Sequence, residues 1–133
     1  MARQRLVNEP VGTRVAVVEG DFFADSLPGG HDVLIVANTV HVLSVAHNIG
    51  LLKAMQAGIE ADAKLLLVDL WMNPTHTQPP AAPLMSGEFL VMSGEGQAYG
   101  EHQADEWLGQ TGWRKLERRA LAGPASVIIA EAI

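Results

Sequence analysis

The stretch Asp32–His41, DVLIVANTVH, decides the fold class of this chain. Within it, Val33–Ala37 is an unbroken apolar run of strand length, and the turn-forming pair Gly29-Gly30 stands shortly before it. An apolar run without polar alternation is typical of a strand that is buried on both faces of a parallel sheet. The stretch therefore predicts an α/β protein in which this run is a central strand.

Polar side chains follow this strand directly. Asn38, Thr39 and His41 come at its carboxyl end, and ligands of open α/β sheets bind beyond the carboxyl ends of the strands. An imidazole at that place can accept or donate a proton near neutral pH. A histidine that merely begins a helix and has no chemical role explains the position of His41 equally well.

Composition narrows the class of protein. The 133 residues suit one domain, and a hydrophobic fraction of 48% with 18% charged residues is typical of a globular protein. The formal net charge of −6 argues against nucleic acid and anionic membrane as partners, because both require a basic surface. There is no cysteine and no apolar run of about 18 residues, and because MARQRLVNEP has no apolar stretch we do not expect it to be a secretory signal. We expect a single cytoplasmic domain over residues 1–133.

Strand and helix patterns alternate along the rest of the chain. Further strands are predicted at Arg14–Glu19, Lys64–Leu70, Trp113–Arg119 and Ser126–Ala130, the last two as an antiparallel edge. Helices are predicted at Ala2–Val7, from the cap Ser44 to Gly58, around Met85–Met92, and at Glu101–Thr111. The second helix has an apolar face of Val45, Ile49, Leu52 and Met55, and Trp71–Pro83 is a proline-rich loop.

Three further groups of residues are candidates for a site. Asp21 and Phe22 follow the strand at Arg14–Glu19, although a phenylalanine there is more often a core or anchoring residue. Asp69 follows four apolar residues of another strand, where burial is costly unless the carboxylate is paired; a solvated strand-end carboxylate is the alternative. Met85, Phe89 and Met92 share one helix face, which is more often core than pocket wall. The five histidines show no helical pair at metal-ligand spacing, and we expect no metal site.

In their order and spacing, these segments resemble the C-terminal catalytic part of the class I S-adenosylmethionine-dependent O-methyltransferases, in the plant-type and bacterial small-molecule group. EGDFF (Glu19–Phe23), DVLIVANTVH and LLLVDLW (Leu65–Trp71) are similar to the ends of the family's third, fourth and fifth strands. GEFLVMSGEG (Gly87–Gly96) resembles the wall of the acceptor pocket, and Glu106–Ala132 the closing helix and last strands. The resemblance implies a partial Rossmann-like methyltransferase sheet, strands three to seven, with flanking helices and an antiparallel C-terminal edge.

The resemblance also implies roles for individual residues. His41 is the expected general base for a small-molecule hydroxyl acceptor, and Asp69 the acid that orients it. Asp21, Phe22, Ala37 and Asn38 are expected to bind S-adenosylmethionine, and Met85, Phe89 and Met92 to line the acceptor pocket.

The sequence departs from the family pattern in several places. His41 is followed by Val42-Leu43 instead of Asp-Trp, and a second acid of the family falls on Gln97, near Glu95. The family's glycine-rich first strand and its second strand have no counterpart in the 133 residues. The chain is accordingly interpreted as a truncated catalytic domain, with weak cofactor binding and no activity of its own. A non-catalytic α/β binding or assembly module is the alternative. Because strand four is left with an open edge, we expect a homodimer or larger homo-oligomer.

Overall fold

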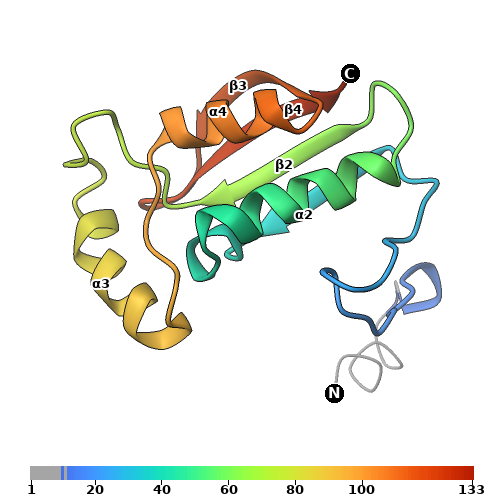
Figure 1. Cartoon of the computed structure of the whole chain (residues 1–133), viewed down its shortest axis with the longest axis horizontal. Helices are drawn as coiled ribbons and strands as arrows, with labels where there is room; N and C mark the ends of the chain where they lie inside the picture. Colours follow the sequence, from blue (N-terminus) through green and yellow to red (C-terminus); the bar gives the residue numbers. More distant parts are fainter. Residues whose placement is uncertain (1–9, 11) are drawn as a thin grey trace.

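The computed structural model describes residue 10 and residues 12–133. Figure 1 shows α2 (Val45–Ala57) and α4 (Glu101–Gln110) against a sheet, with α3 (Ala81–Ser93) set to one side. In chain order the elements are η1 (Gly12–Arg14), β1 (Val33–Ala37), η2 (Val40–Val42), α2 (Val45–Ala57), β2 (Lys64–Asp69), α3 (Ala81–Ser93), α4 (Glu101–Gln110), β3 (Trp113–Ala120) and β4 (Ser126–Ala132). The helix predicted at Ala2–Val7 lies outside the described residues.

The four strands form one mixed sheet in the order β1-β2-β4-β3. β1 and β2 run parallel, with Ile35 opposite Leu66, and β4 runs antiparallel to both β2 and β3, with Ile129 opposite Leu66. The sheet confirms the predicted α/β fold class, the strand at Val33–Ala37 and the antiparallel pair at the C-terminus. β1 is an edge strand, as expected for a sheet without the family's first two strands.

Helices α2 and α4 cover the same face of the sheet and enclose the main core (Figure 1). Leu65 and Leu67 of β2, Leu52 of α2 and Trp107 of α4 are each at most 3% exposed. The indole N–H of Trp113 donates to the carbonyl oxygen of Leu52 at 3.0 Å, which joins β3 to α2. Burial of each large apolar side chain contributes about 1.5–3 kcal/mol to the stability of such a core.

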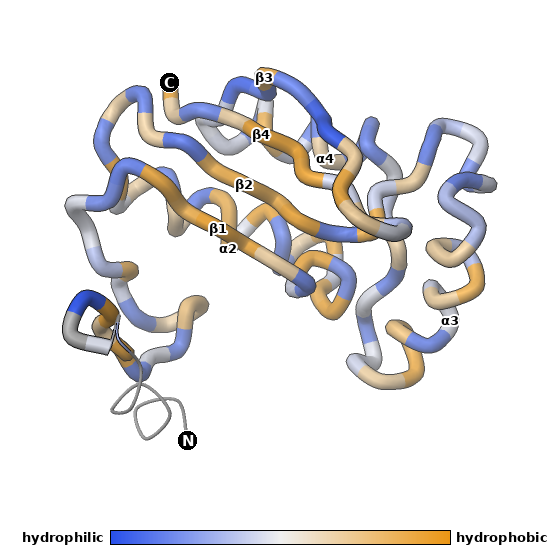
Figure 2. The backbone as a smooth tube through the Cα atoms, turned by 180° about the vertical axis from the view of Figure 1, so that it is seen from behind, coloured by the Kyte–Doolittle hydropathy of each residue, from blue (hydrophilic) through white to orange (hydrophobic). Residues whose placement is uncertain are grey.

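The opposite face of the sheet is not covered by any helix in the part of the chain that the structure describes (Figure 2). Val33 and Ile35 of β1 are 49% and 65% exposed, and burial alternates along β2. The prediction that Val33–Ala37 is buried on both faces is therefore wrong. An apolar run can bury two faces, but whether both are covered depends on neighbouring elements that the run does not contain.

The strand predicted at Arg14–Glu19 is also absent. Gly12–Arg14 is a short 3-10 helix, and residues 15–19 have no regular secondary structure. Val15 and Val18 are 47% and 68% exposed. A strand forms only where a neighbouring strand can take its backbone hydrogen bonds, and the described sheet ends at β1, to which this segment is not paired.

Helix α2 begins after Ser44, whose hydroxyl oxygen accepts the backbone N–H of His47 at 3.2 Å, as predicted for an N-cap. It ends at Ala57, before Gly58. Of the predicted apolar face, Leu52 is buried and Ile49 and Met55 pack against the core, whereas Val45 is 40% exposed. Asn48 and Leu51 are also buried. Helix α4 ends one residue earlier than predicted, and Gly112 after it takes a left-handed conformation with φ of 79°.

Helix α3 begins at Ala81, earlier than predicted, and contains Pro83 in its first turn. Proline fits there because the first N–H groups of a helix have no intrahelical partner. Met85 and Phe89 pack into a small second core with Met72, but Met92 is 74% exposed. The predicted stripe of Met85, Phe89 and Met92 is therefore wrong at its last member.

A network of charged side chains holds α4 against the C-terminal strands. Glu101 accepts hydrogen bonds from Lys115 and, at 2.8 Å, from Arg118. Arg118 also donates to the Ser126 hydroxyl at 3.0 Å and to the Trp71 carbonyl at 2.6 Å. The hydrogen bond from Lys115, followed by that from Arg118, holds the pKa of the Glu101 carboxyl below its usual range, and partial burial only partly opposes this.

We predict that Glu101→Gln lowers the free energy of unfolding by about 1 kcal/mol at pH 7, a value reduced by the partial exposure of the three side chains. Because the folded pKa is lowered, the ionised form stabilises the fold above the unfolded pKa, and this contribution is lost as the pH falls through the folded pKa. The difference between variant and wild type should therefore shrink in acid. Urea denaturation from pH 7 to pH 3 measures it.

Glu106→Gln, an exposed position on the same helix, is the matched control. A loss of stability in Glu101→Gln that stays the same at every pH would show that the charge of Glu101 is not responsible.

Candidate functional site

The parallel pairing of β1 and β2 brings two predicted site residues together. β1 ends at Ala37, and the chain turns through η2, which carries His41; Asp69 is the last residue of β2. Since parallel strands end at the same edge of the sheet, the imidazole and the carboxylate meet there. His41 Nδ1 lies 2.8 Å from Asp69 Oδ1.

Asp69 is buried and fully engaged by donors. Its residue is 3% exposed, and besides the imidazole it accepts the backbone N–H of Leu70 at 2.8 Å and that of His41 at 3.3 Å. The alternative of a solvated strand-end carboxylate is therefore wrong. An ionised carboxylate only accepts hydrogen bonds; beside it the imidazole would carry its ring proton on Nδ1, with the Nε2 lone pair free.

The ring and backbone of His41 are held from other sides as well. The Phe89 ring of α3 stacks on the imidazole with centroids 3.9 Å apart and planes 20° apart. Gly96 packs so tightly that a Cβ there would lie 2.0 Å from the carbonyl oxygen of His41. The His41 side chain is 13% exposed, so it keeps a limited opening to solvent.

Two buried polar side chains fix the 3-10 turn that carries His41. The amide of Asn48 donates to the carbonyl oxygens of Val40 and Leu43 at 3.0 and 3.3 Å. The Tyr99 hydroxyl donates to the Leu43 carbonyl at 2.6 Å, and burial, followed by the charge of Glu95, raises the pKa of that hydroxyl. Sequence reasoning missed both residues. The one available signal was an asparagine on the core side of a helix, where an amide requires partners.

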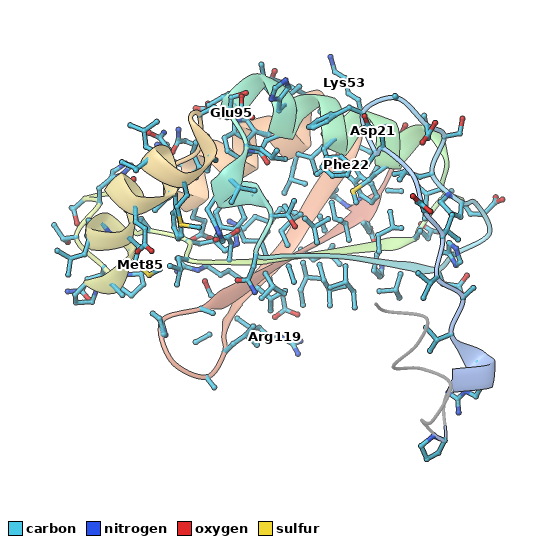
Figure 3. The ribbon with its side chains drawn as sticks, turned by 90° about the horizontal axis from the view of Figure 1, so that it is seen from below. Asp21, Phe22, Lys53, Met85, Glu95 and Arg119 are labelled. Carbon is cyan, nitrogen blue, oxygen red and sulfur yellow. The ribbon has the colours of Figure 1, made fainter. Side chains whose placement is uncertain are left out.

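Three of the four residues expected to bind the cofactor, Asp21, Phe22 and Ala37, line open cavities beside β1. Phe22 and Ala37 line an open cavity of about 360 Å³ between the N-terminal segment, β1 and α2. A neighbouring cavity of the same size is lined by Asp21 and Phe22, and Figure 3 shows these two residues beside α2. Asn38 has a φ of 52° and lines neither cavity.

Asp21 stabilises its own turn. Its Oδ1 accepts the N–H of Phe23 at 2.9 Å, and its backbone N–H donates to Asp25 Oδ2 at 2.7 Å. One carboxylate oxygen of Asp21 is thus already used within the turn.

On the acceptor side, the structure separates the three predicted residues. Phe89 covers His41, Met85 packs beside it in the small core, and Met92 points away from that packing. Figure 3 shows Met85 on the side of α3 that faces the sheet.

Within residue 10 and residues 12–133, no three His, Cys, Asp or Glu side chains gather in a group that could hold a metal ion. In the same part of the chain, no helix is long and apolar enough to cross a membrane.

Comparisons with known proteins agree with this geometry. An O-methyltransferase domain family matches residues 1–114. The O-demethylpuromycin-O-methyltransferase of Streptomyces alboniger is 31% identical over 122 residues, which are 89% of this chain and 32% of that protein. The chain spans about a third of the length of the curated relatives that it matches.

Among solved structures, LaPhzM superposes with a TM-score of 0.90 and 26% identity, over 99% of this chain and 39% of that one. Human N-acetylserotonin methyltransferase, in complex with SAM, has a TM-score of 0.80 and 24% identity over 86% of this chain and 33% of that one. With more than half of its residues matched by the family, the chain belongs to the O-methyltransferase domain family.

Proposed function

We propose that this chain forms the carboxyl-side part of a methyltransferase site in which His41 is the general base and Asp69 orients it. The observation that carries the proposal is the 2.8 Å contact between His41 Nδ1 and a buried carboxylate, which leaves Nε2 to take a proton. Membership of the O-methyltransferase family supports a small-molecule hydroxyl as the acceptor.

The residues of the chain would divide the work as follows. His41 Nε2 removes the proton of the acceptor hydroxyl, and Asp69 stabilises the imidazolium that forms while holding the ring in one tautomer. Phe89 fixes the plane of the imidazole and keeps water from one of its faces. S-adenosylmethionine, when bound, supplies an electrophilic methyl group for this oxygen. Met85 forms part of the wall beside Phe89.

The cofactor would bind between the N-terminal segment and β1. The cavity there is lined by apolar residues, among them Phe22, Ile35 and Ala37, which suits the flat face of an adenine ring. Asp21 stands next to it and has one carboxylate oxygen that can accept from an amine. The cavity is open and few polar groups face it, so the described residues hold one end of such a ligand only.

We predict that this chain binds S-adenosylmethionine weakly or not measurably. Isothermal titration calorimetry should show no saturable heat at micromolar concentrations, because the contacts described are confined to an apolar surface and one carboxylate. S-adenosylhomocysteine and the variant Phe22→Ala serve as comparisons. A micromolar dissociation constant that Phe22→Ala abolishes would contradict this prediction and would show that the chain binds the cofactor on its own.

A second prediction concerns the base. In a chimera in which this chain replaces the matching segment of a solved relative, His41→Ala should lower kcat/KM by about 10²–10⁴, the usual contribution of a positioned base. Asp69→Asn should also lower it, since the amide can donate to the ring and favour the wrong tautomer. Initial rates and thermal unfolding, measured side by side, separate activity from stability.

His102→Ala, an exposed position on α4, is the control that should keep wild-type rates. If His41→Ala turned over as fast as His102→Ala, His41 would have no part in the reaction.

The alternative, a non-catalytic assembly module, is favoured by the open edge of β1. The N–H of Lys64 donates to Asp32 and the N–H of Asn38 donates to Val68, at 2.8 and 3.0 Å. The backbone N–H and C=O groups of the even-numbered residues of β1 therefore face β2. Those of Val33, Ile35 and Ala37 face outward from the sheet edge. Such an apolar, uncharged edge can pair with another chain.

We accordingly predict that the chain forms a homodimer or larger homo-oligomer at micromolar concentration. Pairing can involve β1 alone or an exchange of the segment Met1–Phe23, part of which lies outside the described residues. Ile35→Lys should shift the population toward monomer, because a charge at the centre of an edge opposes pairing. Sedimentation velocity measures both proteins. A folded, monodisperse wild-type monomer would rule out this assembly.

The cytoplasmic location of the protein stays a prediction.

A further inference from the structure

His47 joins two segments that are far apart in the sequence. It lies in the first turn of α2, where its Nδ1 is 2.7 Å from Glu95 Oε1 in the loop after α3. The Phe23 ring of the N-terminal segment lies against the same imidazole, with centroids 4.8 Å apart and planes 43° apart. The side chain of His47 is 52% exposed, so these two contacts account for its placement better than burial does.

The loop on one side of His47 is anchored through Glu95. The hydrogen bond from His47, followed by hydrogen bonds from Ser44, holds the pKa of the Glu95 carboxyl below its usual range, although slight desolvation opposes this. Glu95 therefore remains an anion at the amino end of α2, where the helix dipole favours negative charge.

This loop touches the turn that carries His41. The hydroxyl oxygen of Ser93 accepts the N–H groups of Glu95 and Gly96 at 3.3 and 2.7 Å. Gly96 in turn lies against the backbone of His41 and Val42, and a Cβ on it would be 2.0 and 2.8 Å from their atoms. A displacement of Glu95 must consequently move a segment that has no free space beside His41.

The segment on the other side of His47 carries the residues expected to meet the cofactor. Phe23 packs on Phe22 with ring centroids 4.5 Å apart. Phe22 lines both cavities beside β1, and Figure 3 shows it, with Asp21, next to α2. The ring of His47 thus supports the turn at Asp21–Asp25 through Phe23.

We propose that His47 is a positioning residue that holds both the turn bearing Asp21 and Phe22 and the loop that packs on His41, through separate contacts with Phe23 and Glu95. The importance of this double support for methyl transfer rests on the proposed function, but the double support itself does not. An exposed ion pair adds little to global stability. The consequence of losing His47 is therefore local, in the order of the two segments.

Hydrogen–deuterium exchange of the whole chain, followed by mass spectrometry, tests the proposal directly. His47→Ala should speed exchange severalfold in peptides covering both residues 21–25 and residues 93–99, because local opening becomes easier there. Glu95→Gln should affect only the second peptide, and Phe23→Leu only the first. His31→Ala, an exposed histidine ahead of β1, is the control that should leave both unchanged.

Two replacements at His47 separate its contacts. His47→Phe keeps a ring against Phe23 and should restore protection of residues 21–25 only. His47→Gln keeps a hydrogen-bond donor for Glu95 and should restore residues 93–99 only. If His47→Ala changed neither peptide, or if both replacements restored the same peptide, His47 would not hold both segments.

A second measurement reports on His41 itself. In ¹⁵N spectra of the imidazoles, Glu95→Gln should shift the Nδ1 and Nε2 signals of His41, while thermal unfolding stays close to wild type. Unmoved His41 signals in that variant would overturn the link from Glu95 to the base. This readout does not depend on turnover. The inference about His47 and the proposed role of His41 as a base can therefore fail independently of each other.

Discussion

The buried carboxylate of Asp69 is the constraint on which the site depends. A charge at 3% exposure is stable only if donors surround it, and here they are the His41 imidazole and the backbone N–H groups of His41 and Leu70. Two of the three donors come from the turn after β1. The parallel register of β1 and β2, with Ala37 opposite Val68, determines where that turn begins. The strand register and the path of η2 thus bring the two donors of His41 to this buried carboxylate.

Much of the fold could be predicted from local patterns, and the failures have a common cause. The predicted bounds of the strand Val33–Ala37 were correct to the residue. An apolar run with glycines shortly before it and Asn38 directly after it leaves few other places for the strand to begin and end. The burial of that strand and the strand at Arg14–Glu19 were wrong. Both depend on a neighbour: Ile35 is 65% exposed because nothing described covers its face, and residues 15–19 are not paired with any strand of the described sheet. Periodicity reports which surfaces a segment can bury, whereas the structure shows which of them it does bury.

The same distinction separates the parts of the site. The approach of His41 and Asp69 follows from a rule about strand ends, so it could be predicted before any contact was known. The stacking of Phe89 on His41 could not, since it depends on how α3 lies against η2; the residue was identified, but as a pocket wall. Gly96, Asn48 and Tyr99 were missed for a related reason. Gly96 and Tyr99 act through a close approach and a backbone carbonyl, which are defined only after the loop at residues 94–99 has been placed. Asn48 acts on carbonyls of the turn around η2, whose path the sequence pattern does not give.

The two halves of the site differ in how they are supported. The turn that carries His41 receives contacts from β2, α3, α2 and the loop before α4, all of which lie between residues 44 and 99. Phe22 and Asp21 belong to a segment outside the sheet, which reaches the rest of the chain through rings such as Phe23 and His47. In a chain that spans about a third of its curated relatives, the geometry around His41 is therefore built from local packing. The side proposed for the cofactor is held by fewer and more exposed contacts. Since exposed contacts open with little free energy, the order of the segment at Asp21 and Phe22 is the more sensitive to a ligand or partner that binds there.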